Sequence, residues 1–166
     1  MARIISVDIF MVDLQPMVRR TDAIQSFDSQ QTPFVQITDS DGVTGLGYSY
    51  TIGQGGSAVM ALLRDDLIGQ LIGQDAEEIG RIWRDLLFSI HATAVGAISS
   101  LALAAIDIAL WDLRCKRAKL PLYKMLGGAK SSVAMYTTEG GWLHIHTADL
   151  VADALAAQAK GFSGSK

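Results

Sequence analysis

The N-terminal third of the chain alternates between apolar and other residues with a loose period of two. Every second residue from Ile5 to Met11 is apolar, and residues 34–38 repeat this alternation. Between residues 39 and 42 the sequence Asp-Ser-Asp-Gly is a hairpin turn signal, so residues 43–48 are expected to return as the partner strand. This part of the chain therefore predicts three antiparallel strands.

From Ala58 onward the period of the apolar residues changes to 3.6, which indicates helices. One apolar stripe runs from Val59 to Leu71 and a second from Ile79 to Leu87, while residues 94–116 are apolar nearly all round. The third helix is therefore expected at the centre of a helical layer. Ser57 is the expected N-cap of the first helix.

The C-terminal part of the chain predicts a strand, a helix and a second strand. These are expected at residues 133–138, 148–160 and 162–166, and they are joined by short connections. Two strands linked by a helix are parallel neighbours. Because a single βαβ unit has nothing to close against, more chain is expected.

Composition and charge exclude several classes of protein. The 166 residues are 49% apolar and 19% charged, with a net charge of −3, so the chain lacks the basic field that a nucleic-acid partner requires. No signal peptide and no membrane-spanning apolar run is evident, so no membrane partner is expected. The single cysteine, Cys115, cannot form an internal disulfide. These features favour a cytoplasmic location.

The stretch from Ala104 to Gly128 is the most informative segment of the sequence. It resembles the signature helix of the mandelate racemase and muconate lactonizing enzyme family, within the enolase superfamily. The residues that fall at the family's spacing are Asp107, Ala109, Asp112, Leu113, Lys116 or Arg117, Pro121, Leu126 and Gly127.

This resemblance implies a two-part architecture. Residues 1–130 would form an α+β capping domain, with a three-stranded antiparallel sheet followed by a helical bundle. Residues 131–166 would begin a modified TIM (β/α) barrel that is incomplete in this chain. The boundary between the two parts is expected near residues 129–132.

The resemblance also implies a reaction, namely magnesium-dependent abstraction of the α-proton of a carboxylate through an enediolate intermediate. The ligands of Mg²⁺ are expected on later barrel strands, beyond residue 166, so no metal ligand is assigned within the chain. Lys166 would be the first lysine of the family's Lys-x-Lys pair, with an electrostatic catalytic role. Asp107 and Asp112 lie about 140° apart around a helix and cannot share an ion, so structural pairing is expected for both.

Substrate-binding residues are expected mainly in the long polar loop at residues 15–32. Arginine pairs with carboxylates in bidentate fashion, and polar loop residues would meet a hydroxylated acid. Glu139 is interpreted as a solvated strand end, with contact to a sugar hydroxyl as the alternative. The candidate substrate-binding residues are Arg19, Arg20, Thr21 and Asp22 in this loop, Tyr50 and Ile52 in the second, glycine-rich loop, and Thr138 at the end of the first barrel strand.

The favoured interpretation is an acid-sugar dehydratase, a lyase whose substrate is a small-molecule carboxylate, specifically a sugar acid. A racemase or epimerase, or a cycloisomerase, of the same superfamily is the nearest alternative. A non-catalytic α+β interaction module is the alternative from another class. A homo-oligomer is expected.

Overall fold

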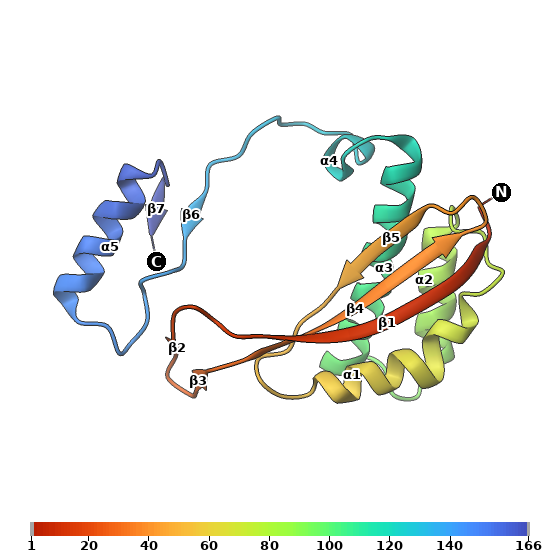
Figure 1. The fold of residues 1–166 in the computed structure, drawn as a ribbon, viewed down its shortest axis with the longest axis horizontal. Helices are drawn as coiled ribbons and strands as arrows, with labels where there is room; N and C mark the ends of the chain where they lie inside the picture. The colour runs from red at the N-terminus through yellow and green to blue at the C-terminus, as the bar shows by residue number, and fades with distance from the viewer. Residues whose placement is uncertain (1, 166) are drawn as a thin grey trace. The chain divides into compact units, whose positions relative to one another are not determined.

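Three antiparallel strands form a sheet in which β4 lies between β1 and β5 (Figure 1). The strands are β1 (Ile4–Leu14), β4 (Gln30–Asp39) and β5 (Thr44–Tyr48). The computed structural model describes residues 2–165. The predicted antiparallel sheet is confirmed, although β4 begins inside the segment that the sequence predicted as loop.

The two faces of the sheet have different environments. Val35 and Ile37 point toward the helices and are fully buried. On the opposite face the ring of Phe34 stacks on Phe10 with centroids 4.9 Å apart and lies 5.7 Å from the ring of Tyr48. Phe10 and Tyr48 remain exposed, so only one face of the sheet belongs to the core.

The first helical segment begins two positions earlier than expected and changes its winding along its length. Helix α1 (Gly56–Leu62) continues into the π-helical turn η1 (Leu63–Leu67) and the 3-10 turn η2 (Ile68–Gln70). Gly55, with φ of 92°, is the N-cap, so the prediction of Ser57 was wrong. A left-handed backbone at the cap suits glycine and disfavours serine.

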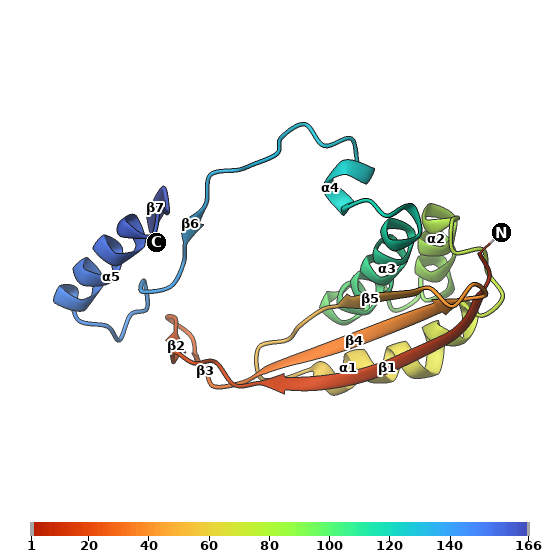
Figure 2. The ribbon, with the colours of Figure 1, turned by 45° about the horizontal axis from the view of Figure 1, so that its top comes forward.

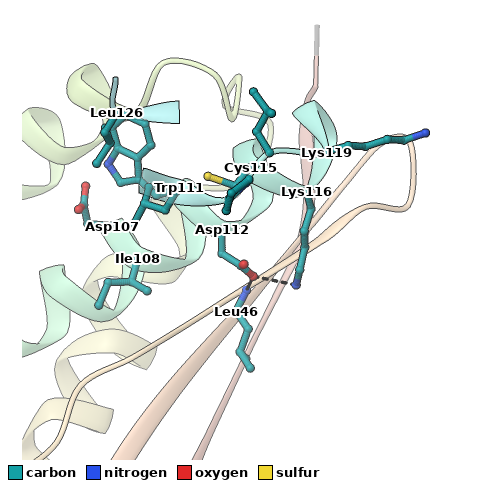
Figure 3. Close-up of a pocket in the computed structure, with 12 residues that line it drawn as sticks. Leu46, Asp107, Ile108, Trp111, Asp112, Cys115, Lys116, Lys119 and Leu126 are labelled. Atoms are coloured by element: carbon teal, nitrogen blue, oxygen red, sulfur yellow. Dashed lines mark hydrogen bonds and ion pairs between the residues drawn. The ribbon is translucent and has the colours of Figure 1, made fainter. Parts of the chain in front are cut away.

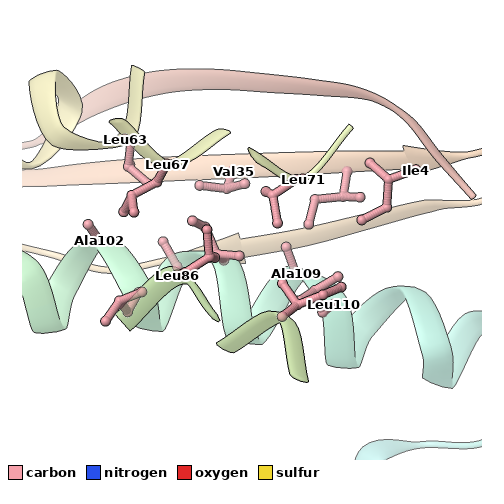
Figure 4. Packing of buried hydrophobic residues seen from close by; sticks show 14 of the residues in the cluster. Ile4, Val35, Leu63, Leu67, Leu71, Leu86, Ala102, Ala109 and Leu110 are labelled. Atoms are coloured by element: carbon pink, nitrogen blue, oxygen red, sulfur yellow. The ribbon is translucent and has the colours of Figure 1, made fainter. Parts of the chain in front are cut away.

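Helix α2 (Ile79–Ser89) packs against α3 (Ala97–Ala118), and α3 lies along β5 and β4. Together with α1, these helices close the core over the sheet (Figure 4). Buried members of this core include Ile4, Val35, Leu63, Leu67, Leu71, Leu86, Ala102, Ala109 and Leu110. Among the helices of residues 2–165, none has the length and apolarity needed to cross a membrane.

The contact between α3 and β5 brings backbone against backbone. A Cβ atom added to Gly47 would lie 2.0 Å from the carbonyl oxygen of Ala105, and one added to Gly45 would lie 2.1 Å from that of Ala109. Any side chain at either glycine would collide with the helix, which explains why two glycines interrupt this strand.

A buried carboxylate joins the end of β4 to the last turn of α3. Asp39 is fully buried, and one of its oxygens accepts hydrogen bonds from the N–H groups of Asp41 and Val43, both at 2.9 Å. Its other oxygen pairs with Arg117, which also binds Asp41 at 2.8 Å. Burial raises the pKa of Asp39, but these hydrogen bonds and the guanidinium charge outweigh it and hold the pKa below its ordinary value.

The chain divides into two compact units. The first contains residues 2–15 and 29–127, and ends with the short helix α4 (Leu122–Met125). The second contains residues 16–28 and 128–165. Its elements are the hairpin strands β2 (Arg20–Thr21) and β3 (Ser26–Phe27), then β6 (Tyr136–Thr137), α5 (Thr147–Ala159) and β7 (Gly164–Ser165).

In the second unit, β6 and β7 pair in parallel through the connection made by α5, as the sequence predicted (Figure 2). Both strands are shorter than expected, because only two residues of each are paired. The first of the two predicted strands covers residues 133–138, but only Tyr136 and Thr137 belong to β6. Within residues 128–165 each of these strands pairs with only one other strand. Fewer of its residues therefore form the hydrogen bonds that define a strand.

Candidate functional site

The long loop between β1 and β4 folds into a small hairpin that presents four of the predicted substrate-binding residues. Arg20 and Thr21 form β2 and pair with Phe27 and Ser26 of β3. Arg19 precedes β2 and donates a hydrogen bond of 3.2 Å to the Ser26 hydroxyl. The hydroxyls of Thr21 and Ser26 lie 3.4 Å apart. The predicted loop is therefore a short ordered hairpin.

Asp22 holds the turn of this hairpin. Its Oδ1 accepts hydrogen bonds from the N–H groups of Ile24 at 2.7 Å and Gln25 at 2.9 Å. The bond from Gln25, followed by that from Ile24, lowers the pKa of the Asp22 carboxyl. Asp22 therefore has a structural role in the turn, and its contact with substrate stays a prediction.

The segment after β6 carries the second part of the candidate site. Thr138 directly follows β6 and is exposed. Glu139 comes next, and its N–H donates to the Thr137 hydroxyl at 3.1 Å. Glu139 is exposed, as expected for a solvated strand end, and its carboxylate is in addition bound to two side chains.

These partners are Arg20 and Trp142, and we call the three residues the Arg20–Glu139–Trp142 cluster. Arg20 Nη2 donates to Glu139 Oε1 at 2.6 Å, and Trp142 Nε1 donates to Glu139 Oε2 at 3.3 Å. The guanidinium carbon of Arg20 lies 5.9 Å from the centre of the indole ring. Sequence reasoning missed Trp142. An indole in a polar loop after a strand was the available signal, since such a ring usually has a partner.

The remaining predicted residues belong to the first unit or lie outside the described residues. Tyr50 and Ile52 are exposed in the first unit, in the segment that leads from β5 to α1. Gln31 anchors that segment, because its Oε1 accepts hydrogen bonds from the Gly56 N–H at 2.9 Å and the Thr51 hydroxyl at 3.3 Å. Lys166 lies outside the described residues.

Within residues 2–165, no group of three or more His, Cys, Asp or Glu side chains lies close enough together to hold a metal ion. The acidic side chains of this part of the chain are instead distributed among turns, ion pairs and the helix surface. These residues therefore do not fit a magnesium site by themselves.

A groove of about 790 Å³ runs along α3 in the first unit (Figure 3). At one end Asp112 pairs with Lys116 at 2.7 Å and accepts a hydrogen bond from the Leu46 N–H at 2.8 Å, which confirms its structural role. Asp107 has no ion-pair or hydrogen-bond partner within residues 2–165, so the pairing expected for it is not found. Burial raises the pKa of its carboxyl.

A three-stranded antiparallel sheet covered by helices, followed by a βαβ unit, defines the class of a capping domain that leads into a (β/α) barrel. The family model for the N-terminal domain of mandelate racemase and muconate lactonizing enzyme matches residues 5–127. The chain belongs to this family of the enolase superfamily.

Relatives with known activities share this region. The chain is 44% identical over 133 residues to 3,6-anhydro-alpha-L-galactonate cycloisomerase of Streptomyces coelicolor, which covers 80% of the chain and 36% of that protein. It is 34% identical over 131 residues to L-talarate/galactarate dehydratase of Salmonella typhimurium, and this alignment covers 79% of the chain and 33% of the dehydratase. A D-mannonate dehydratase of Caulobacter sp. is 40% identical over 129 residues, covering 77% and 31%. These alignments cover about a third of each relative's length.

Solved structures match nearly the whole chain. The crystal structure of the Salmonella typhimurium L-talarate/galactarate dehydratase, with Mg and L-lyxarohydroxamate, has a TM-score of 0.93 at 29% identity and covers 99% of the chain and 43% of that protein. A racemase from Streptomyces coelicolor with bound magnesium has a TM-score of 0.92 at 37% identity, and the match covers 98% of the chain and 45% of the racemase. These neighbours bind magnesium, and their folds confirm the predicted fold class.

Proposed function

We propose that the protein containing this capping domain is an enzyme that abstracts the α-proton of a sugar acid and then eliminates water. The observation that carries this proposal is the recurrence of sugar-acid dehydratases among the relatives and solved structures. A talarate/galactarate dehydratase matches nearly the whole chain in structure, and both this enzyme and a mannonate dehydratase match more than three quarters of it in sequence. The named substrates of these dehydratases are hydroxylated acids, which suits the polar hairpin loop.

The chemistry explains why the chain supplies only part of such a site. An α-proton next to a carboxylate is very weakly acidic, so the developing enediolate needs nearby positive charge. Magnesium supplies such charge when bound, and we expect its ligands beyond residue 166. Within this chain, Lys166 would add an ammonium group, Thr138 would donate a hydrogen bond to the substrate carboxylate, and the hairpin loop would contact the distal end of the acid.

Cycloisomerisation is the second candidate. The 44% identity to a cycloisomerase of Streptomyces coelicolor favours it over racemisation or epimerisation. All of these reactions begin with removal of the same α-proton, so they place the same demands on Thr138 and Lys166. No observation on residues 2–165 favours a non-catalytic interaction module.

Mass spectrometry of reaction products tests this proposal. The longer enzyme should be incubated with magnesium and a panel of sugar acids in D₂O. Dehydration gives an α-keto acid that is lighter by one water. Cycloisomerisation or epimerisation gives a product of unchanged composition apart from exchanged hydrogen. If no sugar acid incorporates solvent deuterium at the α-carbon and none is consumed, the proposal is wrong.

Three further parts of the proposal concern the whole protein. A capping domain at residues 1–130 and a barrel that starts at residues 131–166 are consistent with a family match that ends at residue 127. We also propose a homo-oligomer, which analytical ultracentrifugation tests directly. A cytoplasmic location is supported by the single cysteine, Cys115, which is buried as a free thiol.

A further inference from the structure

The two adjacent arginines of the hairpin loop are in different electrostatic situations. Arg20 is bound to a carboxylate, that of Glu139, at 2.6 Å. Arg19 is exposed and bonds only to the neutral hydroxyl of Ser26, and no carboxylate lies within ion-pair distance of it in residues 2–165. One guanidinium is therefore already neutralised, whereas the positive charge of the other is uncompensated.

The contact between Arg20 and Glu139 is part of a larger attachment. Arg20 and Glu139 lie 119 residues apart in the sequence but within the same compact unit. Trp142 adds an indole hydrogen bond to Glu139 and a ring beside the guanidinium. The backbone contributes as well, because the Leu143 N–H donates to the Thr21 carbonyl oxygen at 3.4 Å. Several weak contacts thus converge on β2.

The orientation of Arg20 depends on these contacts. Its Nε is buried and has no hydrogen-bond partner within residues 2–165. A buried donor without a partner costs free energy, so this conformation persists only if other contacts hold it. Glu139 and Trp142 supply those contacts, and removing the Glu139 charge should release the side chain.

We propose that Glu139 is a positioning residue that fixes Arg20 and, through it, the hairpin loop, which leaves Arg19 as the guanidinium available to the second carboxylate of a diacid substrate. The assignment of Arg19 rests on the proposed function. The attachment of the loop by Glu139 does not, because it concerns contacts within this chain alone.

Hydrogen exchange tests the attachment without any substrate. In Glu139→Gln, amides of residues 17–28 and the Leu143 amide should exchange about two- to fivefold faster, the factor for loss of an exposed ion pair. Asp149→Asn is the matched control, since it removes one exposed carboxylate from α5 of the same unit and should leave these rates unchanged. The charge-swapped pair Arg20→Glu with Glu139→Arg should restore slow exchange. Equal rates in Glu139→Gln and the parent chain would overturn the attachment.

Steady-state kinetics of the longer enzyme tests the assignment of Arg19. Arg19→Ala should raise KM about tenfold for a diacid and leave KM for the matching monoacid unchanged, because only the diacid offers a second carboxylate. Arg20→Ala and Glu139→Gln should change both substrates by the same factor. A diacid-specific effect in Arg20→Ala would overturn the assignment, and so would equal effects of Arg19→Ala on the two acids. If no sugar acid is turned over, the proposed function fails, while the exchange result still decides the attachment.

Discussion

Two aspartates of the first unit have environments that shift their pKa values in opposite directions. Asp39 is buried among hydrogen-bond donors and a guanidinium, which favour its charged form. Asp107 lies in the groove on α3, where burial disfavours the charge and no partner within residues 2–165 offsets it. Burial raises the pKa at both positions, but only at Asp39 do hydrogen bonds and a guanidinium reverse the net shift.

Asp39→Asn should lower the stability of the chain at neutral pH by about 2 kcal/mol, because it removes a charged hydrogen-bond acceptor from Arg117. The pKa of Asp39 is lowered by folding, so its contribution is complete above the ordinary value of 3.8 and disappears as pH falls through the folded-state pKa. Urea unfolding at pH 7 and at pH 5 should show the same loss. A variant as stable as the parent at both pH values would contradict this account.

Asp107→Asn should have the opposite effect. Folding raises the pKa of this carboxyl, so its contribution favours the native state at low pH and becomes unfavourable as pH rises through the aspartate range. The substitution should raise Tm at pH 7 by about 1–2 °C, the shift for roughly half a kcal/mol in a domain of this size. Thermal melts should show no gain at pH 3, where the wild-type carboxyl is already protonated. A loss of stability at pH 7 would indicate an unidentified partner for Asp107.

Lys166→Ala in the longer enzyme should reduce kcat about a hundredfold or more, because an electrostatic stabiliser acts mainly in the transition state. Circular dichroism checks that the fold is intact. Lys130→Ala, which removes a lysine between the two predicted domains, is the control and should leave kcat unchanged. An unchanged kcat in Lys166→Ala would show that this lysine is a solvated residue without a catalytic role.

Among the elements, the close approach of α3 to β5 is the most sensitive to substitution. Gly47→Ala should destabilise the chain by about 1–3 kcal/mol or more, because the new Cβ would meet backbone atoms of α3 that cannot rotate away. Gly80→Ala in α2 is the matched control. A Cβ there meets nothing within 4 Å, so alanine should be neutral or stabilise by up to about 1 kcal/mol. Equal melting temperatures for the two variants would contradict the close packing.

Elements that depend on local periodicity could be predicted from the sequence. The alternation from Ile5 and the apolar stripe from Val59 each reflect a face that packs on its neighbour, so the sheet and helices were found. The helix start was misplaced because Gly55 caps through its left-handed backbone, which leaves little trace in hydrophobic patterning.

The parts of the candidate site that depend on distant contacts could not be predicted. The pairing of Glu139 with Arg20 was missed because the two residues lie far apart in sequence and no local pattern joins them. For the same reason Arg19 and Arg20 were predicted to have the same role. Only the folded structure shows that, within residues 2–165, Arg20 is paired with a carboxylate and Arg19 is not. The candidate roles of Thr138, Tyr50 and Ile52 in binding substrate stay predictions.

At the scale of the whole molecule, residues 1–166 alone should neither bind magnesium tightly nor turn over a sugar acid. Within residues 2–165 no acidic cluster can hold an ion, and the proposed ligands lie further along the polypeptide. Calorimetric titration with magnesium chloride measures this directly, with the dehydratase of Salmonella typhimurium as a positive control. A submicromolar magnesium site in the 166-residue chain would show that the ligands have been assigned to the wrong part of the protein.

The order of the elements has a consequence for synthesis on the ribosome. The sheet is complete at Tyr48, but α3, which covers β5 and β4, ends only at Ala118. At about 5–20 residues per second, the intervening stretch of about 70 residues takes roughly 4–14 seconds to translate. Throughout that interval α3 cannot cover Val35 and Ile37, so we expect α1 to be their only helical cover until α3 is complete and Arg117 pairs with Asp39.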